Sequence, residues 1–170
     1  MKIPILHLEE GIHHYDFTIE GGSLHFYREE VYPHEMQVHV ELNKFERNIK
    51  CTIHVETTAH YICDRCLVEY ERPFAEDFEV LFHIGTRDLI TDEEDVIILP
   101  PETVDIDLTE RLQEFLILNV PMKMLCTDTC KGICAGCGAD LNHEECRCTE
   151  QPIDPRWLKL KELLDKSPER

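Results

Sequence analysis

Basic side chains are scarce in this 170-residue sequence: 17 lysines and arginines stand against 35 aspartates and glutamates, a formal net charge of −18 at pH 7. Proteins that bind nucleic acids use Lys and Arg to displace counterions from phosphates. The acidic excess therefore excludes an ordinary nucleic-acid binder, and we expect no direct RNA binding through the acidic face. Such a surface attracts basic proteins, or it serves only to keep the protein soluble.

Long hydrophobic runs are also missing. The longest ones, Val96–Leu99 and Phe115–Leu118, are far shorter than the roughly 18 residues that a membrane-spanning helix requires. The first residues, from Met1 to His7, turn polar too early for the hydrophobic region of a secretory signal. We therefore expect a cytoplasmic protein with no membrane contact.

Motifs of common catalytic centres are absent as well. The sequence has no glycine-rich phosphate loop and no G-x-S-x-G nucleophile elbow. It contains ten histidines, but several, among them His39, His54 and His60, fall on the polar side of predicted strands, which is typical of surface histidine. We predict that the protein is not an enzyme.

Alternating hydrophobicity predicts strands over most of the first hundred residues. Apolar and polar residues alternate over residues 35–43 and again over 49–61, the period-two pattern of half-buried strands. The short polar segment between these runs predicts a hairpin. Similar patterns predict further strands over residues 12–19, 24–28 and 78–84, and a short apolar run follows over residues 96–99.

Two helices are expected in the last third of the chain. Apolar residues recur at helical spacing from Leu108 to Asn119, with Asp107 or Thr109 as the cap and Pro121 as the stop. Asp154-Pro155 predicts the start of a second helix, with an apolar stripe that includes Trp157.

These elements predict an α+β fold with a curled antiparallel sheet of about five to seven strands, C-terminal helices and a small Cys-rich module resembling a zinc ribbon. We divide the chain into an acidic β-rich body with one helix, residues 1–125, and a Cys-rich knuckle with the C-terminal helix, residues 126–170. We expect the two parts to pack as one unit.

The sequence contains nine cysteines, most of them near its end. Without an export signal, clustered cysteines are more often metal ligands than disulfide partners. The strongest motif is Cys134-Ala135-Gly136-Cys137-Gly138, because glycines let such a turn point backbone N–H groups at two thiolates. This knuckle predicts a structural Zn²⁺ site.

A tetrahedral zinc site needs two more thiolates, and several are available. Cys126 and Cys130 lie upstream of the knuckle, and Cys146 and Cys148 lie downstream. We favour Cys126 and Cys130, with Cys148 as the main competitor.

A further C-x-x-C pair, Cys63 and Cys66, follows the strand predicted over residues 49–61. We rank this pair below the later cysteines as a source of zinc ligands. It could complete a site with Cys134 and Cys137, or form a second, partial site. It is equally compatible with a simple turn that contains two small residues.

Cys130, Cys134 and Cys137 also match the C-x-x-x-C-x-x-C spacing of radical enzymes that use S-adenosylmethionine. Those enzymes need a large βα barrel after the motif, and only 33 residues follow Cys137. Radical chemistry is therefore excluded, whereas a zinc-handling or thiol-redox protein remains an alternative class.

Two stretches of the sequence resemble the YceD family. Cys63-Asp64-Arg65-Cys66-Leu67, followed by Phe74, resembles the family's C-x-R-C-L signature. The later stretch resembles the cysteine-bearing members through Pro121-Met122-Lys123, Cys126, Cys130-Lys131-Gly132-Ile133-Cys134, Cys137-Gly138, Leu141-Asn142 and Asp154-Pro155-Arg156.

The resemblance implies a part in the accumulation of large-subunit (23S) ribosomal RNA, hence in ribosome biogenesis, without an established catalytic activity. It also implies that the metal reinforces the scaffold, because not every member of the family keeps the cysteines. Together with the charge, it predicts that the acidic segment Glu69–Glu114 binds a basic ribosomal protein or assembly factor.

Overall fold

The computed structural model describes residues 1–85, 96–148 and 157. By its internal contacts the chain divides into two compact units. The first comprises residues 1–63 and 68–126, and the second comprises residues 64–67 together with the chain from Thr127 onward.

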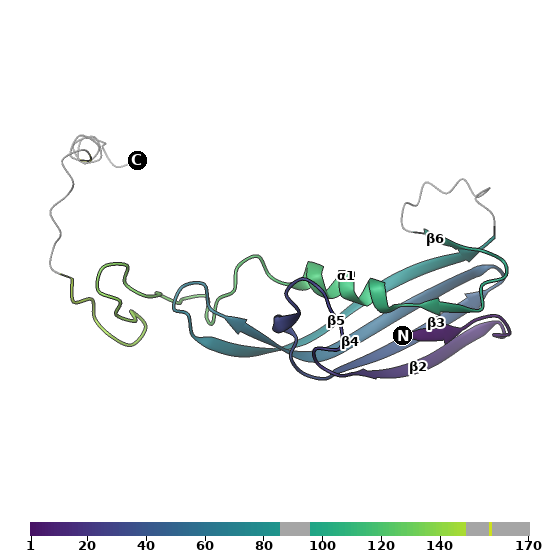
Figure 1. Ribbon diagram of the computed structural model, residues 1–170, viewed down its shortest axis with the longest axis horizontal. Coiled ribbons are helices and arrows are strands. Elements are labelled where there is room, and N and C mark those ends of the chain that lie inside the picture. The colour runs from purple at the N-terminus through teal and green to yellow at the C-terminus, as the bar shows by residue number, and fades with distance from the viewer. Residues whose placement is uncertain (86–95, 149–156, 158–170) are drawn as a thin grey trace. The chain divides into compact units, whose positions relative to one another are not determined.

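A five-stranded sheet forms most of the first unit, in the order β2-β3-β4-β5-β6 (Figure 1). The strands are β2 (Gly11–Ile19), β3 (Met36–Phe45), β4 (Asn48–Ile62), β5 (Glu69–Ile84) and β6 (Val96–Leu99). The first four pair antiparallel, and β6 joins the edge of β5 in parallel. A separate two-stranded sheet pairs β1 (Lys2–Pro4) with β7 (Asp105–Asp107).

The strands predicted over residues 12–19, 35–43 and 49–61 are confirmed, as is the hairpin that joins the last two. Its two-residue loop places Glu46 at a positive φ of 53°. The antiparallel part of the predicted sheet is therefore correct, and the parallel β6 is an addition that hydrophobic patterning did not reveal.

The strand predicted over residues 24–28 is wrong. These residues form turns that lead into the 3-10 helix η1 (Glu29–Val31). Arg28 has a φ of 64°, a left-handed conformation that a strand cannot contain. The apolar residue in this segment has another role: the centroid of the Phe26 ring lies 6.3 Å from that of the Tyr32 ring.

The helix α1 (Thr109–Asn119) lies along the apolar face of the sheet, as predicted for this segment (Figure 1). The N-cap position is taken by Leu108, which makes no side-chain cap hydrogen bond, but Asp107, one residue earlier, accepts a hydrogen bond from the Thr109 N–H at 2.9 Å. On the buried side of the helix, Leu112 and Leu116 are fully buried, and the Phe115 ring stacks on Phe78 at 4.3 Å.

Tyr32 connects η1, the sheet and α1. Its hydroxyl donates a hydrogen bond to the carbonyl oxygen of Leu116 at 3.1 Å. Its ring meets Phe74 edge-on at 5.4 Å. Burial raises the pKa of the Tyr32 phenol, so the hydroxyl remains a donor at any physiological pH.

The second helix predicted from Asp154 lies outside the described residues, where Trp157 alone is described. Within residues 1–85 and 96–148, no helix has both the length and the hydrophobicity of a membrane span.

Leu116 and Leu118 provide a matched test of how α1 packs, since the first is 0% and the second 83% exposed on the same helix. We expect Leu116→Ala to lower the free energy of unfolding by about 2–5 kcal/mol, because it leaves a cavity. Leu118→Ala should change it by less than about 0.5 kcal/mol. Urea denaturation measures both, and equal losses would contradict the packing described above.

Candidate metal sites

The structure gathers eight of the nine cysteines into two groups of four. In each group the Sγ atoms all lie within 4.8 Å of one another. We call Cys63, Cys66, Cys126 and Cys130 the buried cluster, and Cys134, Cys137, Cys146 and Cys148 the exposed cluster.

The grouping differs from the one that the sequence favoured. We favoured Cys126 and Cys130 as partners of the knuckle, but the structure places them with the early C-x-x-C pair. The knuckle instead meets the downstream cysteines, Cys146 and Cys148. Neither cluster includes His143, whose side chain is 81% exposed.

The sulfur spacing of the exposed cluster fits a tetrahedral metal site. The Sγ of Cys134 lies 3.4 Å from that of Cys146 and 3.6 Å from that of Cys148, and Cys137 lies 4.0 Å from Cys146. Zn–S bonds of about 2.3 Å at tetrahedral angles separate sulfurs by about 3.8 Å. These distances are too long for a disulfide bond, which measures about 2.05 Å.

Backbone N–H groups stabilise thiolates in the exposed cluster. Hydrogen bonds from the backbone of Cys137 and of Gly136, then from neighbouring thiols, lower the pKa of Cys134 to about 6. The pKa of Cys137 is lowered chiefly by the backbone N–H of Ala139. These are the N–H groups that a zinc knuckle points at its sulfurs, so the turn favours the charged form that a metal requires.

The fourth thiol behaves in the opposite way. Hydrogen bonds to Cys134 and Cys146 raise the pKa of Cys148 to about 12. With no cation among them, four neighbouring thiols cannot all lose their protons, because like charges repel one another. A divalent ion at the centre removes that obstacle.

The exposed cluster leaves no space beside Gly136. A Cβ atom added there would lie 2.5 Å from the Sγ of Cys148. The turn is closed by two hydrogen bonds, from the Cys134 N–H to the Ala139 carbonyl at 2.8 Å and from the Gly138 N–H to the Cys134 carbonyl at 2.9 Å. Gly138 has the unusual φ, 73°, that the sequence predicted for this turn, whereas Gly136 has no positive φ and is required for space.

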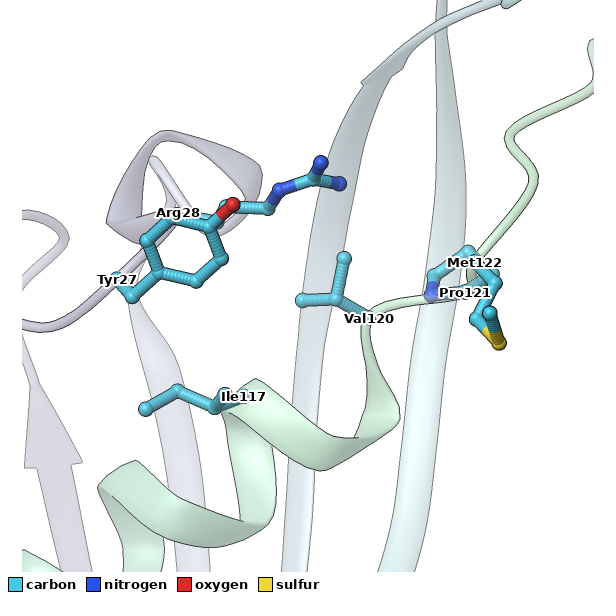
Figure 2. A pocket seen from close by; sticks show the side chains of 6 residues that line it. All are labelled: Tyr27, Arg28, Ile117, Val120, Pro121 and Met122. Atoms are coloured by element: carbon cyan, nitrogen blue, oxygen red, sulfur yellow. The ribbon is translucent and has the colours of Figure 1, made fainter.

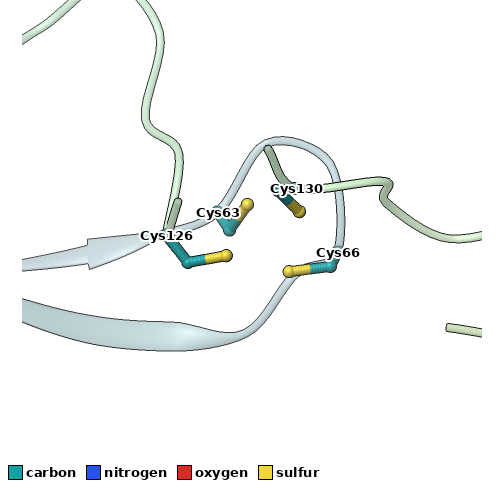
Figure 3. A group of neighbouring side chains, drawn as sticks. All are labelled: Cys63, Cys66, Cys126 and Cys130. Atoms are coloured by element: carbon teal, nitrogen blue, oxygen red, sulfur yellow. The ribbon is translucent and has the colours of Figure 1, made fainter. Parts of the chain in front are cut away.

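The buried cluster includes the turn between β4 and β5, and its four sulfurs point toward one another (Figure 3). The Cys63 N–H donates to the Val68 carbonyl at 2.9 Å, which closes the turn. Leu67 adopts a φ of 61°, a conformation that costs a non-glycine residue energy and often marks a functional turn. Cys63 and Cys130 are 0% and 2% exposed.

Arg65, inside the first C-x-x-C, holds the segment that carries Cys130. Its guanidinium donates to the Cys130 carbonyl at 2.6 Å, and its own carbonyl accepts from the Ile133 N–H at 2.9 Å. Gly132 permits this approach: it has a φ of 78°, and a Cβ there would lie 2.9 Å from the Arg65 carbonyl oxygen.

Asn142 is a further positioning residue that motif reasoning missed. Its side-chain oxygen accepts from the Lys131 N–H at 2.8 Å, and its amide donates to Asp140 at 2.7 Å and to the Cys130 Sγ at 3.5 Å. The backbone N–H of Asn142 also lowers the pKa of Asp140. Asn142 forms part of the family resemblance, but no spacing rule assigns it this role.

Both clusters could hold a metal ion. Four thiolates form a soft donor set that selects zinc or iron–sulfur centres over magnesium and calcium. Among the described residues, no other group of three or more His, Cys, Asp or Glu side chains converges in this way. The ninth cysteine, Cys51, lies in the core, where burial raises its pKa to about 12 and suppresses its reactivity.

The described pockets differ in their linings, and one on the outer face of the sheet is lined by residues that include Asp16, His39 and His54. Another, of about 300 Å³, lies between the end of α1 and the turn before η1, and is mainly apolar (Figure 2). It is lined by Tyr27, Arg28, Ile117, Val120, Pro121 and Met122, a set without a carboxylate, histidine or thiol. Within the described part of the chain, no charged side chain is buried.

Substitutions at Gly132 and Gly138 distinguish the energetic cost of backbone strain from the cost of a steric clash. Both have φ values near 75°, but only Gly132 faces a backbone atom, whereas the space beside Gly138 is open. We expect Gly138→Ala to cost about 1 kcal/mol from its φ alone, and Gly132→Ala to cost clearly more.

Hydrogen–deuterium exchange of the amides of Ile133 and Leu141 reports this difference, since both donate across this turn region. Gly132→Ala should speed their exchange well beyond the effect of Gly138→Ala. Equal exchange in the two variants would show that the Arg65 carbonyl does not constrain the turn.

The sequence profile of the family described as "Large ribosomal RNA subunit accumulation protein YceD" matches residues 51–164. The chloroplast protein named Large ribosomal RNA subunit accumulation protein YCED homolog 1 of Arabidopsis thaliana is 32% identical over 74 residues, 44% of this chain and 23% of that protein. The uncharacterized protein YlbN of Bacillus subtilis is 32% identical over 108 residues, 63% of this chain and 61% of that protein.

An uncharacterized protein of Mycobacterium tuberculosis is 33% identical over 104 residues, 60% of this chain and 49% of that protein. The chain thus spans less than two thirds of the length of each of these relatives. No solved structure matches it. Because the family profile covers well over half of the chain, including all eight clustered cysteines, the chain belongs to the YceD family, which is named for the accumulation of large-subunit ribosomal RNA.

Proposed function

We propose that this protein is a non-catalytic ribosome biogenesis factor that promotes the accumulation of large-subunit ribosomal RNA by binding a basic ribosomal protein or assembly factor. Membership of the YceD family carries the first part of the proposal. The charge of the protein supports the second, because a net charge of −18 opposes contact with phosphates and favours contact with cationic surfaces.

The outer face of the five-stranded sheet is the surface that best fits such a partner. It lies opposite the apolar face that packs against α1, and it is formed by the alternate residues of β2 to β5. Its only lysine or arginine from these strands is Lys50, which pairs with Glu79 at 2.8 Å. Its exposed carboxylates are Asp16, Glu41, Glu56, Glu69, Glu71, Asp77 and Glu79.

A row of side chains crosses this face at one level of the sheet. Asp16, His39, His54 and Asp77 are direct neighbours on β2, β3, β4 and β5. The His39 ring contacts the Asp16 carboxylate at 2.6 Å, and His54 contacts both Asp77 and Glu56. Hydrogen bonds to Glu56 and then to Asp77 raise the pKa of His54.

The charge of the row is therefore sensitive to pH. A raised pKa means that His54 gains its proton at a higher pH than an isolated histidine does. Acidification makes the face less negative, which weakens attraction to a cationic partner. Binding should accordingly be strongest at neutral to mildly alkaline pH.

We also propose that the metal held by the cysteines is structural Zn²⁺. The all-thiolate donor sets and the tetrahedral sulfur spacing support zinc, and the exposed cluster lies in a unit whose described residues form only one isolated β-bridge, between Ile133 and Asp140. Small units of this kind gain folding energy from the ion.

One observation favours the rival class, a zinc-handling or thiol-redox protein. Cys137, Cys146 and Cys148 are exposed, and the pKa of Cys134 is lowered to about 6, which are properties of accessible thiolates. A redox protein would keep these thiols free for reaction, whereas a structural site keeps them bound to metal. Metal content after gentle purification separates a structural site from a redox protein, and the rate of metal release to a chelator separates it from a zinc-handling protein.

Depletion of the protein from its own cells tests its role in rRNA accumulation. We expect the ratio of large-subunit to small-subunit rRNA to fall, and the wild-type gene to restore it. An unchanged ratio in fully depleted cells would refute the role.

Capture on the immobilised protein at low salt, followed by mass spectrometry, tests the partner. We expect the protein to capture basic ribosomal proteins or assembly factors. Added salt should release them, because it shortens the Debye length below about 10 Å. The double variant Glu41→Gln/Glu56→Gln should weaken capture by about 2- to 30-fold, from roughly 0.2–1 kcal/mol per exposed charge.

The matched control, Glu9→Gln/Glu30→Gln, removes the same charge from exposed positions outside the β2–β5 face and outside Glu69–Glu114, and should have little effect. Equal loss from both double variants would mean that net charge, and not this face, attracts the partner. Recovery of bare rRNA without a basic protein would overturn the proposed mode of binding.

A further inference from the structure

We propose that the two cysteine clusters bind two separate Zn²⁺ ions of unequal lability, one that the buried cluster retains and one that the exposed cluster exchanges with solution. This inference deepens the zinc part of the proposed function and is independent of the role in rRNA accumulation. Its new content is the number of ions, the ligand set of each, and the accessibility of the second.

The two donor sets do not share a sulfur. Each cluster supplies four thiols within 4.8 Å of one another, which completes a tetrahedral shell without a bridging ligand. A single ion cannot use both sets, and one set leaves no open position for a thiol of the other. Two saturated sites therefore predict two zinc ions per chain.

Cys130 and Cys134 show how the sets are kept apart. Only three residues separate them, yet they belong to different clusters. The left-handed turn at Gly132, with a φ of 78°, lies between them. The Ile133 N–H is bound to the Arg65 carbonyl, and the Cys134 N–H is bound to the Ala139 carbonyl, so the backbone directs one cysteine to each site.

The sites differ in access to solvent. Zinc leaves a thiolate site fastest when an incoming ligand can reach the metal before the old bonds break. In the buried cluster Cys63 and Cys130 are 0% and 2% exposed, and Cys66 and Cys126 are half-buried. In the exposed cluster Cys137, Cys146 and Cys148 are exposed and only Cys134 is partly covered.

The sites also differ in how their ligands are anchored. The cysteines of the exposed cluster all come from residues 134–148, and the last two follow each other with one residue between them. In the buried cluster, Cys63 directly follows β4, and Cys66 lies in the closed turn before β5. Loss of the Cys63 or Cys66 sulfur from the buried site therefore requires opening of a hairpin, whereas the exposed site can open locally.

Metal analysis of the gently purified full chain, followed by timed release to a chromogenic zinc chelator, tests the inference. We expect two zinc ions per chain, released in two phases of equal amplitude whose rates differ by at least tenfold. Cys137→Ser should remove one equivalent and the fast phase. Cys66→Ser should remove one equivalent and the slow phase.

Gly136→Ala provides a test that keeps every ligand. Its added Cβ would lie 2.5 Å from the Sγ of Cys148, so it should speed the fast phase and leave the slow phase unchanged. Cys51→Val changes the one cysteine outside both clusters and is the matched control, with two ions and wild-type release expected.

If a serine variant fails to fold, titration of the metal-free wild-type chain with Co²⁺ counts the metal sites instead. The absorption of tetrahedral thiolate-bound cobalt should rise through two equivalents. One equivalent, in either measurement, would overturn the two-site inference and leave a structural zinc in place, whereas no bound metal would overturn the zinc proposal too. A fast phase that disappears with Cys66→Ser and persists with Cys137→Ser would reverse the assignment and overturn the claim about exposure.

Discussion

The long antiparallel pairing of β4 with β5 is the constraint on which the rest of the structure depends. The ladder runs without interruption from Asn48 opposite His83 to Ile62 opposite Glu69. Because successive side chains in a strand point to opposite faces, this one register assigns apolar residues to the side of α1 and polar residues to the other side. A slip of one residue would exchange the two faces along the whole ladder.

The same pairing determines the geometry of the first C-x-x-C. The ladder ends at Ile62 and Glu69, so Cys63 and Cys66 must lie in the connecting turn, where the hydrogen bond from Cys63 to Val68 closes the backbone. Thiols that are held at the end of a rigid hairpin lose little further conformational entropy when they bind a metal. A C-x-x-C that follows a strand is therefore a prepared pair of ligands.

The clustered thiols and the exposed carboxylates occupy different places in this protein. The cysteine thiols form the converging donor sets among the described residues, and they lie in turns and loops outside the strands. The carboxylates are spread over an exposed sheet face, where each is worth little but their sum produces an attractive field for cations.

Local patterns in the sequence were sufficient to predict several strands, the helix α1 and the cysteine knuckle. Strict alternation identified β2, β3 and β4, and helical spacing with an aspartate near its start identified α1, because these signals depend only on near neighbours. The glycines around Cys134 and Cys137 identified the knuckle for the same reason, and the order of cysteine motifs identified the family.

Tertiary structure alone decided which strands pair and which cysteines lie together. The parallel edge strand β6 and the grouping of Cys130 with Cys63 join segments that are distant in sequence, and no local pattern encodes such a distance. The turn at Gly132 and the hydrogen bonds of Arg65 separate Cys130 from Cys134, although their spacing suggested one site. The sequence by itself therefore determined which residues are candidate ligands, and three-dimensional packing decided which cysteines lie together, because proximity of thiols depends on distance in space and not along the chain.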